Sequence, residues 1–507
     1  MNKLKLISMA LLAMSVKAFA QEKTEPTPQW RPTYHFTPDK NWTNDPNGLI
    51  FLDGKFQLYY QHNPFENKWG HMSWGHATST DLVHWKHLPV AIPEVVTKDT
   101  TTWIYSGSAV LDKKNTSGFG KNGKAPLVAI FTADQPKQKK ESQFIAYSNN
   151  GGLSFKMYAG NPVIDLNKRD FRDPNVFWFE PAKQWIMTVA MVDEHMVRFY
   201  GSKNLKQWTK LSDFGPAGYT KNGWECPSLI PLPVDGNPAK TKYVLFVSCG
   251  GDHGPLMQYY IGDFDGKTFK NDNAADKLLT VDYGDAFYAA IAWRDAPQDK
   301  KILLGWLQNG RKETYPWKGQ MAIPHDLSIK TTPDGLRLFQ NPSTIVSSKL
   351  PVLSKGRVLT KANLVIDDKK VSLTENGKFN SNANWIDAEF EVGKAQKFGF
   401  SLTEKDGTER NVLVGYDVAK QQLYIDCSNS EKANKSPENL VQTAPLKAIN
   451  GVVKIKVLID KSSLEVFGND GEKVISTMIY PDAAATGVSV FAEGKAVLKK
   501  LKLWDLQ

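Results

Sequence analysis

The chain has 507 residues and a formal net charge of +10, and 41% of its residues are hydrophobic. This length exceeds the usual size of one domain, so we expect two domains with sizeable cores. Lysine and arginine alternate with acidic residues along the sequence and form no stripe, which argues against nucleic acid as a partner. Only Cys226, Cys249 and Cys427 are present, and this sparse, odd set argues against a disulfide framework.

The first twenty residues are typical of a secretory signal peptide. The cationic start MNKLK precedes the apolar run LISMALLAMSV, and Ala18-Phe19-Ala20 forms a small-residue cleavage site. That run is too short to span a bilayer as a permanent helix, and no later segment is long and apolar enough, so we expect no membrane insertion. We predict that the segment 1–20 is cleaved near Ala20 and that the protein is exported, to a periplasm or to the cell exterior.

Residues 30–340 are short β-rich runs broken by Gly, Asn, Asp and Pro, without a convincing long amphipathic helix. A strand pair recurs at intervals of about 60 residues, and a second recurring segment combines a turn with an aromatic residue. Four-stranded units repeated radially predict a five-bladed β-propeller, with a large β-sandwich as the alternative. The pairs begin near Asp45, Ser106, Asp173, Glu225 and Phe287, and the aromatic residues of the second segment are Trp85, Phe155, Trp208 and Phe269.

Residues 345–507 have a different pattern. Alternating runs such as WIDAEFEV, KFGFSL and VVKIKVLID, joined by turn residues, predict an antiparallel β-sandwich. This segment holds no cluster of catalytic residue types, so we interpret it as a packing domain. The predicted fold class is therefore all-β, a five-bladed propeller followed by a C-terminal β-sandwich.

Three carboxylates, Asp45, Asp173 and Glu225, stand at matching positions of the propeller repeat. Taken alone, NDPNG is usually a turn and RDP a structural ion pair. The innermost strands of a propeller run along its central channel, however, so residues at their starts converge at one end. We therefore predict that the three carboxylates share one cavity, and paired carboxylates in a narrow channel suit the cleavage of a glycosidic bond.

The neighbours of two of these residues suggest separate roles. Glu225 lies between Trp224 and Cys226, and apolar surroundings together with nearby like charges favour the protonated form that a general acid requires. Asp173 follows Arg172, which should keep it ionised. It therefore suits a fixed charge or an acceptor for sugar hydroxyls.

Asp45 has neighbours that suit an ionised nucleophile. Asn44, Asn47 and Gly48 are all able to donate hydrogen bonds to its carboxylate. No CxxC, HExxH or paired-histidine spacing occurs, so we expect no metal site.

Aromatic residues are abundant near the predicted mouth of the channel, where sugar C–H faces pack well on rings. Most tryptophans of a propeller belong to the core between blades. Trp69 and Trp306 are the better candidates for sugar contact, because they follow turn-rich or strand-end positions, and Gln61 ends the first strand pair within reach of sugar hydroxyls. The tryptophans considered for a sugar-binding floor are Trp42, Trp69, Trp74, Trp103 and Trp306.

The ordered motifs WTNDPNG, YQHNP, KWGHMSWGHATSTDLVHW, YSGSAV, FRDP, WECPSL, ILLGWLQN and SSLEVFGNDG resemble those of glycoside hydrolase family 32, over essentially the whole chain. The resemblance implies hydrolysis of β-fructofuranosides with retention and without a cofactor. It further implies that Asp45 is the nucleophile, Glu225 the acid/base and Asp173 the stabiliser of the transition state. The implied pocket for the terminal fructose contains Asn44, Gln61, Trp69, Tyr105, Ser106, Arg172 and Trp306.

Two positions depart from the family pattern: Thr43 replaces a common methionine, and Gly310 stands where a tryptophan often follows the GW motif. We expect an exo-acting enzyme that releases fructose from levan or inulin, with sucrose as a lesser substrate. Fructosyl transfer and endo-action on the same scaffold are alternatives, as is a fructan-binding protein without catalysis, which would be expected to have lost a carboxylate.

Overall fold

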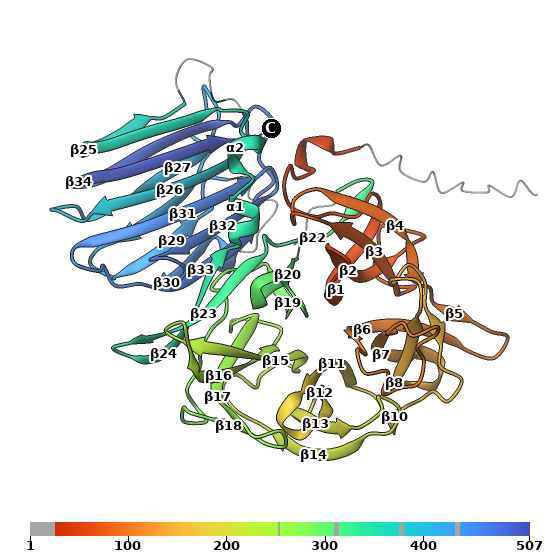
Figure 1. Cartoon of the computed structure of the whole chain (residues 1–507). Helices are drawn as coiled ribbons and strands as arrows, with labels where there is room; N and C mark the ends of the chain where they lie inside the picture. Colours follow the sequence, from red (N-terminus) through yellow and green to blue (C-terminus); the bar gives the residue numbers. More distant parts are fainter. Residues whose placement is uncertain are drawn as a thin grey trace, which may run out of the picture.

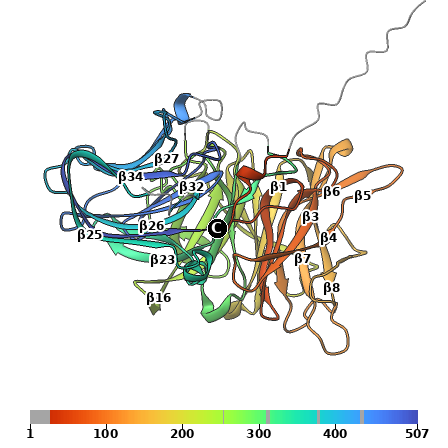
Figure 2. The same cartoon turned by 90° about the horizontal axis from the view of Figure 1, so that it is seen from above.

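The structure is a computed structural model, and it describes residues 26–251, 254–308, 314–374, 379, 381–430 and 437–506. The predicted signal peptide and Gly310 lie outside the described residues. Within them, the chain forms five radial sheet units followed by a two-layered β-structure, which lie side by side (Figures 1 and 2). The predicted fold class is confirmed.

The first three blades are antiparallel sheets in which sequence order matches spatial order, as expected for strands joined by short turns. The short β5 (Val95–Val96) pairs with the innermost strand of blade 2. Blade 1 consists of β1 (Asn41–Leu52), β2 (Lys55–Asn63), β3 (Ser73–Ser79) and β4 (Trp85–Ile92); blade 2 of β6 (Thr101–Leu111), β7 (Leu127–Gln135), β8 (Lys140–Ser148), β9 (Lys156–Met157) and β10 (Ile164–Lys168); blade 3 of β11 (Phe171–Phe179), β12 (Gln184–Met191), β13 (Met196–Ser202) and β14 (Thr209–Phe214).

Blades 4 and 5 are joined by one parallel pairing between β15 and β23. Two short strands complete this region, because β22 (Gln320–Met321) pairs with β20 and β21 (Trp317–Lys318) pairs with β1, which connects blade 5 to blade 1. Blade 4 consists of β15 (Glu225–Val234), β16 (Asn237–Ser248), β17 (Met257–Phe264) and β18 (Phe269–Asn271); blade 5 of β19 (Phe287–Ala292), β20 (Ile302–Leu307), β23 (His325–Thr332) and β24 (Gly335–Pro342).

The five predicted strand pairs are the innermost pairs of these blades, and the predicted outer aromatic residues begin or directly precede the outer strands β4, β9, β14 and β18. In Figure 1 the innermost strands β1, β6, β11, β15 and β19 surround the centre of the ring. The first strand differs from the prediction in one respect. It begins at Asn41, so Asp45 lies within β1 and not at its start.

Each innermost strand has a β-bulge near its start. The pairing register shifts between Thr43 and Pro46, Ile104 and Gly107, Arg172 and Asn175, Glu225 and Ser228, and Tyr288 and Ile291. A bulge leaves residues unpaired and turns side chains out of the regular alternation. The bulges therefore direct side chains from five blades toward the channel end.

Two short helices, α1 (Thr344–Ser347) and α2 (Leu350–Leu353), lead from the propeller into the sandwich. The long β34 holds the sandwich together: its first half pairs with β27, its second half with β26, and β25 pairs along most of its length. The sandwich strands are β25 (Val358–Ser372), β26 (Ala383–Glu391), β27 (Lys397–Glu404), β28 (Val412–Asp417), β29 (Gln422–Asp426), β30 (Val441–Pro445), β31 (Val452–Asp460), β32 (Ser463–Gly468), β33 (Lys473–Met478) and β34 (Gly487–Asp505).

Short 3-10 turns occur at Pro28–Trp30, Pro136–Gln138, Glu180–Ala182, Pro297–Asp299 and Pro437–Asn439. Among the described residues, we find no helix with the length and apolar character that crossing a membrane requires.

The propeller and the sandwich share a buried cluster of charges. The two nitrogens of the His35 ring lie 2.8 Å from Asp460 Oδ2 and 2.6 Å from Glu465 Oε1, and none of the three side chains is exposed. Asp460 also accepts backbone N–H hydrogen bonds from Thr33, Tyr34 and His35. The segment before β1 is thereby fixed to the sandwich, which in turn fixes where β1 enters the channel.

Candidate active site

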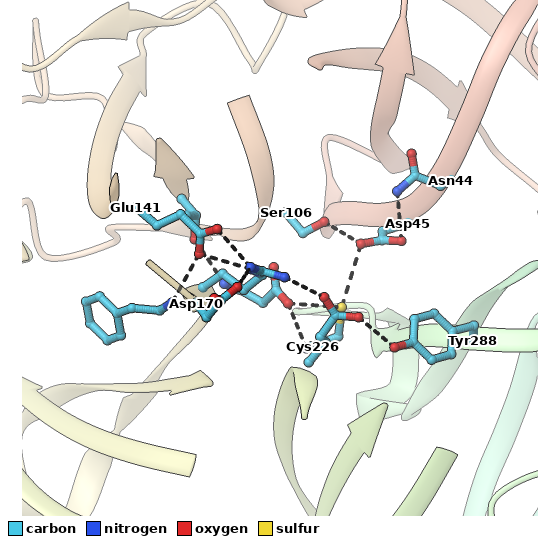
Figure 3. A network of polar contacts seen from close by, with 12 residues as sticks. Asn44, Asp45, Ser106, Glu141, Asp170, Cys226 and Tyr288 are labelled. Atoms are coloured by element: carbon cyan, nitrogen blue, oxygen red, sulfur yellow. Dashed lines mark hydrogen bonds and ion pairs between the residues drawn. The ribbon is translucent and has the colours of Figure 1, made fainter. Parts of the chain in front are cut away.

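A cavity of about 340 Å³ lies at the channel end where the innermost strands begin. All three predicted carboxylates line it, and so do all seven residues of the implied sugar pocket. The radial repeat thus brings together residues that are 128 and 52 positions apart in sequence, because Asp45, Asp173 and Glu225 come from blades 1, 3 and 4. Figure 3 shows the polar contacts around this cavity.

Asp45 lies in the bulge of β1 and accepts hydrogen bonds from three side chains, those of Ser106, Asn44 and Cys226. Ser106 Oγ donates to its Oδ2 at 2.6 Å, and Asn44 Nδ2 donates to its Oδ1 at 3.0 Å (Figure 3). Burial raises the pKa of Asp45, these hydrogen bonds lower it, and the charge of Glu225 raises it, with a net rise above the ordinary value. The predicted donor Asn47 does not contribute, because its amide bonds to Pro46 O and to Gln61.

Asp173 is 6% exposed and lies in the bulge of β11 with a φ of 65°. The backbone N–H of Cys226 donates to its Oδ2 at 2.9 Å, and the Cys226 thiol lies 3.5 Å from the same oxygen and 3.7 Å from Asp45 Oδ2. The thiol therefore faces both aspartates. Burial of the thiol and the charges of Asp173 and Asp45 raise the pKa of Cys226 well above its ordinary value. The thiol is therefore a neutral donor here.

The expectation that Arg172 keeps Asp173 ionised is wrong in its main point. Arg172 bonds other carboxylates, while burial and the charge of Glu225 raise the pKa of Asp173, an effect that Arg172 only partly offsets. The bulge is the physical reason, because it turns consecutive side chains in different directions.

Glu225 is held by two donors from neighbouring blades. Arg172 Nη1 donates to its Oε1 at 2.8 Å, and the Tyr288 hydroxyl donates to its Oε2 at 2.6 Å. The predicted apolar contacts are not what surrounds this carboxylate: Trp224 Nε1 donates to Tyr219 O, and the Cys226 thiol faces the aspartates. Glu225 is also not equivalent to Asp173, since it is the last paired residue before its bulge.

Arg172, Glu225 and Tyr288 do hold equivalent positions, each directly before the bulge of its own strand in blades 3, 4 and 5. The guanidinium is oriented by Glu141, which is fully buried and accepts from Arg172 Nε at 3.0 Å and from Nη2 at 2.8 Å, and it also contacts Asp170. A two-point contact of this kind fixes both the position and the plane of an arginine. The guanidinium of Arg172 is thus oriented so that it donates to Glu225.

The predicted binding residues line the same cavity as the carboxylates. Gln61 is 2% exposed and donates to Asn47 Oδ1 at 2.7 Å and to Ile104 O at 3.0 Å. Trp69 is 52% exposed at the rim, with its ring 6.2 Å from that of Tyr105, and Trp306 lies edge-on to Trp42 at 6.1 Å.

Trp74 lies outside this site, because it is completely buried against Tyr59 between blades. Trp103 does not line the cavity itself but contacts Trp69 at its edge. Thr43 is buried and donates to Gln61 O, so this departure from the family pattern does not face the cavity.

Sequence reasoning missed Tyr288, Glu141, Arg169 and Asp170, all of which line the cavity. Tyr288 stands next to the predicted strand start at Phe287, so the repeat could have identified it. Glu141 belongs to the third strand of blade 2, and nothing in its local sequence indicates that it faces Arg172. Among the described residues, no group of three or more His, Cys, Asp or Glu is arranged to hold a metal ion.

The geometry agrees with comparisons to known proteins. Residues 35–342 match the model of the glycosyl hydrolases family 32 N-terminal domain, and residues 355–505 match that of the family 32 C-terminal domain. A levanase of Bacillus subtilis is 42% identical over 98% of this chain and 73% of its own. An extracellular exo-inulinase of Aspergillus awamori is 36% identical over 92% of both chains.

A solved structure is similar as well. The β-fructofuranosidase of Schwanniomyces occidentalis, in complex with fructosyl-erythritol, matches with a TM-score of 0.85 and 29% identity over 95% of this chain and 99% of its own. The resemblance seen in the sequence motifs is confirmed. The chain belongs to glycosyl hydrolases family 32 and is a glycoside hydrolase.

Proposed function

We propose that this protein is a retaining, exo-acting β-fructofuranosidase that removes terminal fructosyl units from levan or inulin, with sucrose as a lesser substrate. The observation that carries the proposal is the convergence of Asp45, Asp173 and Glu225 around one cavity with aromatic walls. The relatives support the substrate class, since they include a levanase, an exo-inulinase and an enzyme that binds fructosyl-erythritol.

In this proposal Asp45 attacks the anomeric carbon of the terminal fructose while Glu225 protonates the departing oxygen. The carbon–oxygen bond breaks as an ester to Asp45 forms, and Glu225 then takes a proton from the water that cleaves this ester. Two displacements at the same carbon retain its configuration. Asp173 accepts hydrogen bonds from fructose hydroxyls, and Ser106 and Asn44 hold the Asp45 carboxylate in place.

The electrostatics support a proton source in the cavity. Asp45 and Asp173 both have raised pKa values, because buried carboxylates close to one another resist losing all their protons. Such a proton belongs to the cluster as a whole. Arg172 Nη1 donates to Glu225 Oε1 and is unable to accept a proton from it. Glu225 Oε2, which faces the Tyr288 hydroxyl, is therefore the oxygen that suits proton transfer to the leaving group.

We assign the chemistry to the propeller, residues 30–340, and a packing role to residues 345–507.

We also propose that the chain is exported after cleavage near Ala20. The N-terminal sequence pattern supports this, as does the extracellular relative. Mass spectrometry of the protein recovered outside the cytoplasm should give a mature N-terminus at Gln21, and an intact Met1 would contradict it.

The proposal is tested by digesting inulin, levan and sucrose side by side and separating the products by chromatography. Fructose as the sole early product from the polymers is expected, whereas a ladder of oligosaccharides would show endo-action or transfer. Proton NMR during the first turnovers should show fructose in the anomeric configuration of the substrate. Immediate appearance of the opposite anomer would contradict the retaining mechanism.

A further inference from the structure

Another large cavity, which we call the far cavity, lies where the innermost strands end, opposite the active site. Its volume is about 420 Å³, which is enough for a small organic molecule. Leu111 at the end of β6, Phe177 near the end of β11 and Ala292 at the end of β19 all line it. Among the described residues, none that lines the active-site cavity also lines this one.

The passage between the two cavities is narrow. A space of about 10 Å³ shares Ser106 and Asp173 with the active-site cavity and reaches Asn175, which contacts Arg294 in the wall of the far cavity. This volume holds about one water molecule, so a sugar is unable to pass. The far cavity is therefore not an extension of the sugar pocket.

The aromatic side chains of the far cavity have already used their N–H groups. Trp185 Nε1 donates to Thr116 Oγ1 at 2.9 Å, and Trp178 Nε1 donates to the Glu180 carboxylate. Both tryptophans therefore offer a ligand their ring surface and no hydrogen-bond donor. Apolar walls with few polar groups are typical of sites for small molecules. Phe177, Trp178, Trp185, Ile230 and Trp293 contribute apolar surface to these walls.

Four cationic side chains line the far cavity, and three of them form ion pairs with carboxylates. Arg294 is the fourth, and among the described residues it forms no ion pair with a carboxylate. One positive charge of the wall is therefore unmatched. The three pairs are Lys113 with Asp295 at 2.8 Å, Lys114 with Glu180 at 3.3 Å, and Lys301 with Asp299.

The guanidinium of Arg294 has few partners. Its Nη2 donates to Asn175 Oδ1, which is the one hydrogen bond of its five N–H groups among the described residues, and it lies 5.5 Å from the centre of the Phe177 ring. Burial lowers the pKa of Arg294 to about 10, and the charge of Asp295 offsets this only in part. A buried charge without a counterion is costly, so a bound anion would stabilise it.

The backbone fixes where this arginine lies. The Arg294 N–H donates to Leu49 O at 2.9 Å, and the Arg294 C=O accepts from the Phe51 N–H at 2.9 Å, so the residue is bonded to β1 on both sides. A group that is already held in place loses little freedom when a ligand binds to it.

We propose that the far cavity binds a monocarboxylate with a flat apolar body, with its carboxylate on Arg294 and its body against Phe177 and Trp178. A guanidinium binds a carboxylate through two parallel hydrogen bonds. One unmatched positive charge favours a ligand with one negative charge. An inorganic anion would have to give up its water against apolar walls, and an uncharged sugar would leave the guanidinium without a counterion.

The experiment measures binding to the wild-type protein by isothermal titration calorimetry at pH 7 and constant ionic strength. Benzoate and 3-phenylpropanoate are the probes, and benzyl alcohol, inorganic phosphate and fructose are the comparisons. We expect saturable binding of at least one of the two carboxylates, at least about ten-fold tighter than that of benzyl alcohol, because hydrogen bonds to a charged group are gained. Phosphate should bind more weakly than the carboxylate.

Arg294→Gln should weaken the binding of the carboxylate at least about ten-fold, since it removes the unmatched charge. Lys114→Gln is the matched control, because it changes the net charge equally at a cation that is 58% exposed and already paired. It should bind the carboxylate nearly as the wild type does. Trp178→Ala removes part of the apolar wall and provides a second test if Arg294→Gln does not fold, which circular dichroism would show.

Several results would overturn the site. These are no saturable binding of either carboxylate, equal affinity for benzyl alcohol, tighter binding of phosphate, equal losses in Arg294→Gln and Lys114→Gln, or unchanged binding in Trp178→Ala. Competition between the carboxylate and inulin would also overturn it, because the ligand would then lie in the active-site cavity. The proposed function is tested separately, by the release of fructose.

Discussion

The active-site cavity and the boundary between propeller and sandwich each bury several carboxylates, and they differ in how fully these are matched by donors. At the boundary, Asp460 receives three backbone N–H bonds and both boundary carboxylates contact the His35 ring. In the cavity, the guanidinium of Arg172 is divided among Glu141, Asp170 and Glu225, and Asp45 and Asp173 receive none of its hydrogen bonds.

The pKa values follow this difference. Burial alone would lower the pKa of His35, but its bonds to Asp460 and Glu465 outweigh burial and raise it to about 9. Burial would raise the pKa of Glu465, but His325 and His35 lower it to about 2. In the cavity the pKa values of Asp45 and Asp173 go up instead. Matched carboxylates, those that receive enough hydrogen-bond donors, thus stabilise the fold. Undermatched carboxylates, those with too few donors, keep a proton available for chemistry.

The largest expected effect is on turnover in the cavity. Asp45→Ala and Glu225→Ala each remove a group that acts on the reacting bond, and each should lower kcat by at least about 100- to 10,000-fold while the protein stays folded. Steady-state kinetics with sucrose and inulin, together with circular dichroism, would measure this. Near-normal turnover in either variant would refute the assigned roles.

The boundary cluster should show the opposite behaviour. Glu465→Gln leaves His35 without one of its two carboxylates and should lower the free energy of unfolding by about 3–5 kcal/mol, the usual effect of breaking a buried ion pair. The kcat of the molecules that remain folded should be close to that of the wild type. Urea unfolding followed by tryptophan fluorescence provides the measurement, and a large loss of kcat at unchanged stability would contradict the comparison.

The pH dependence of stability separates the two groups of charges further. The folded-state pKa of His35 is above its ordinary 6.5, so its contribution is complete below pH 6.5 and disappears as the pH rises to about 9. Glu465 has a lowered pKa, so its contribution is complete above pH 4.5 and disappears as the pH falls to about 2. The difference in unfolding free energy between the wild type and His35→Gln should therefore shrink between pH 6.5 and 9. A constant difference over this range would show that His35 stays neutral.

The smallest expected effect concerns the orientation of the acid. Tyr288→Phe removes the hydrogen bond to Glu225 Oε2 and should lower kcat about ten-fold, with little change in KM, because a bond to a charged group is lost. The pH profile of kcat should shift as well, since the environment of the transferred proton changes. An unchanged rate and profile would mean that Arg172 alone positions Glu225.

The sequence alone predicted the parts of this molecule that depend on local pattern. Alternating runs, turn residues and a repeated aromatic located the innermost and outer strands, and the strand starts located the three carboxylates. The direction of each side chain was not predictable, because it depends on bulges that turn consecutive residues apart, as for Arg172 and Asp173. Contacts across blades and domains, such as Glu141 with Arg172 or His35 with Asp460, join segments whose local sequences contain no sign of their partners.

Asp173→Asn tests the central claim most directly, because asparagine has the same shape and tolerates the positive φ at this position. Turnover and the free energy of unfolding should be measured on the same preparation at pH 7. We predict that turnover is almost completely lost while stability stays the same or rises, since one member of an undermatched group of carboxylates has been neutralised. A marked loss of stability with turnover retained would contradict the account.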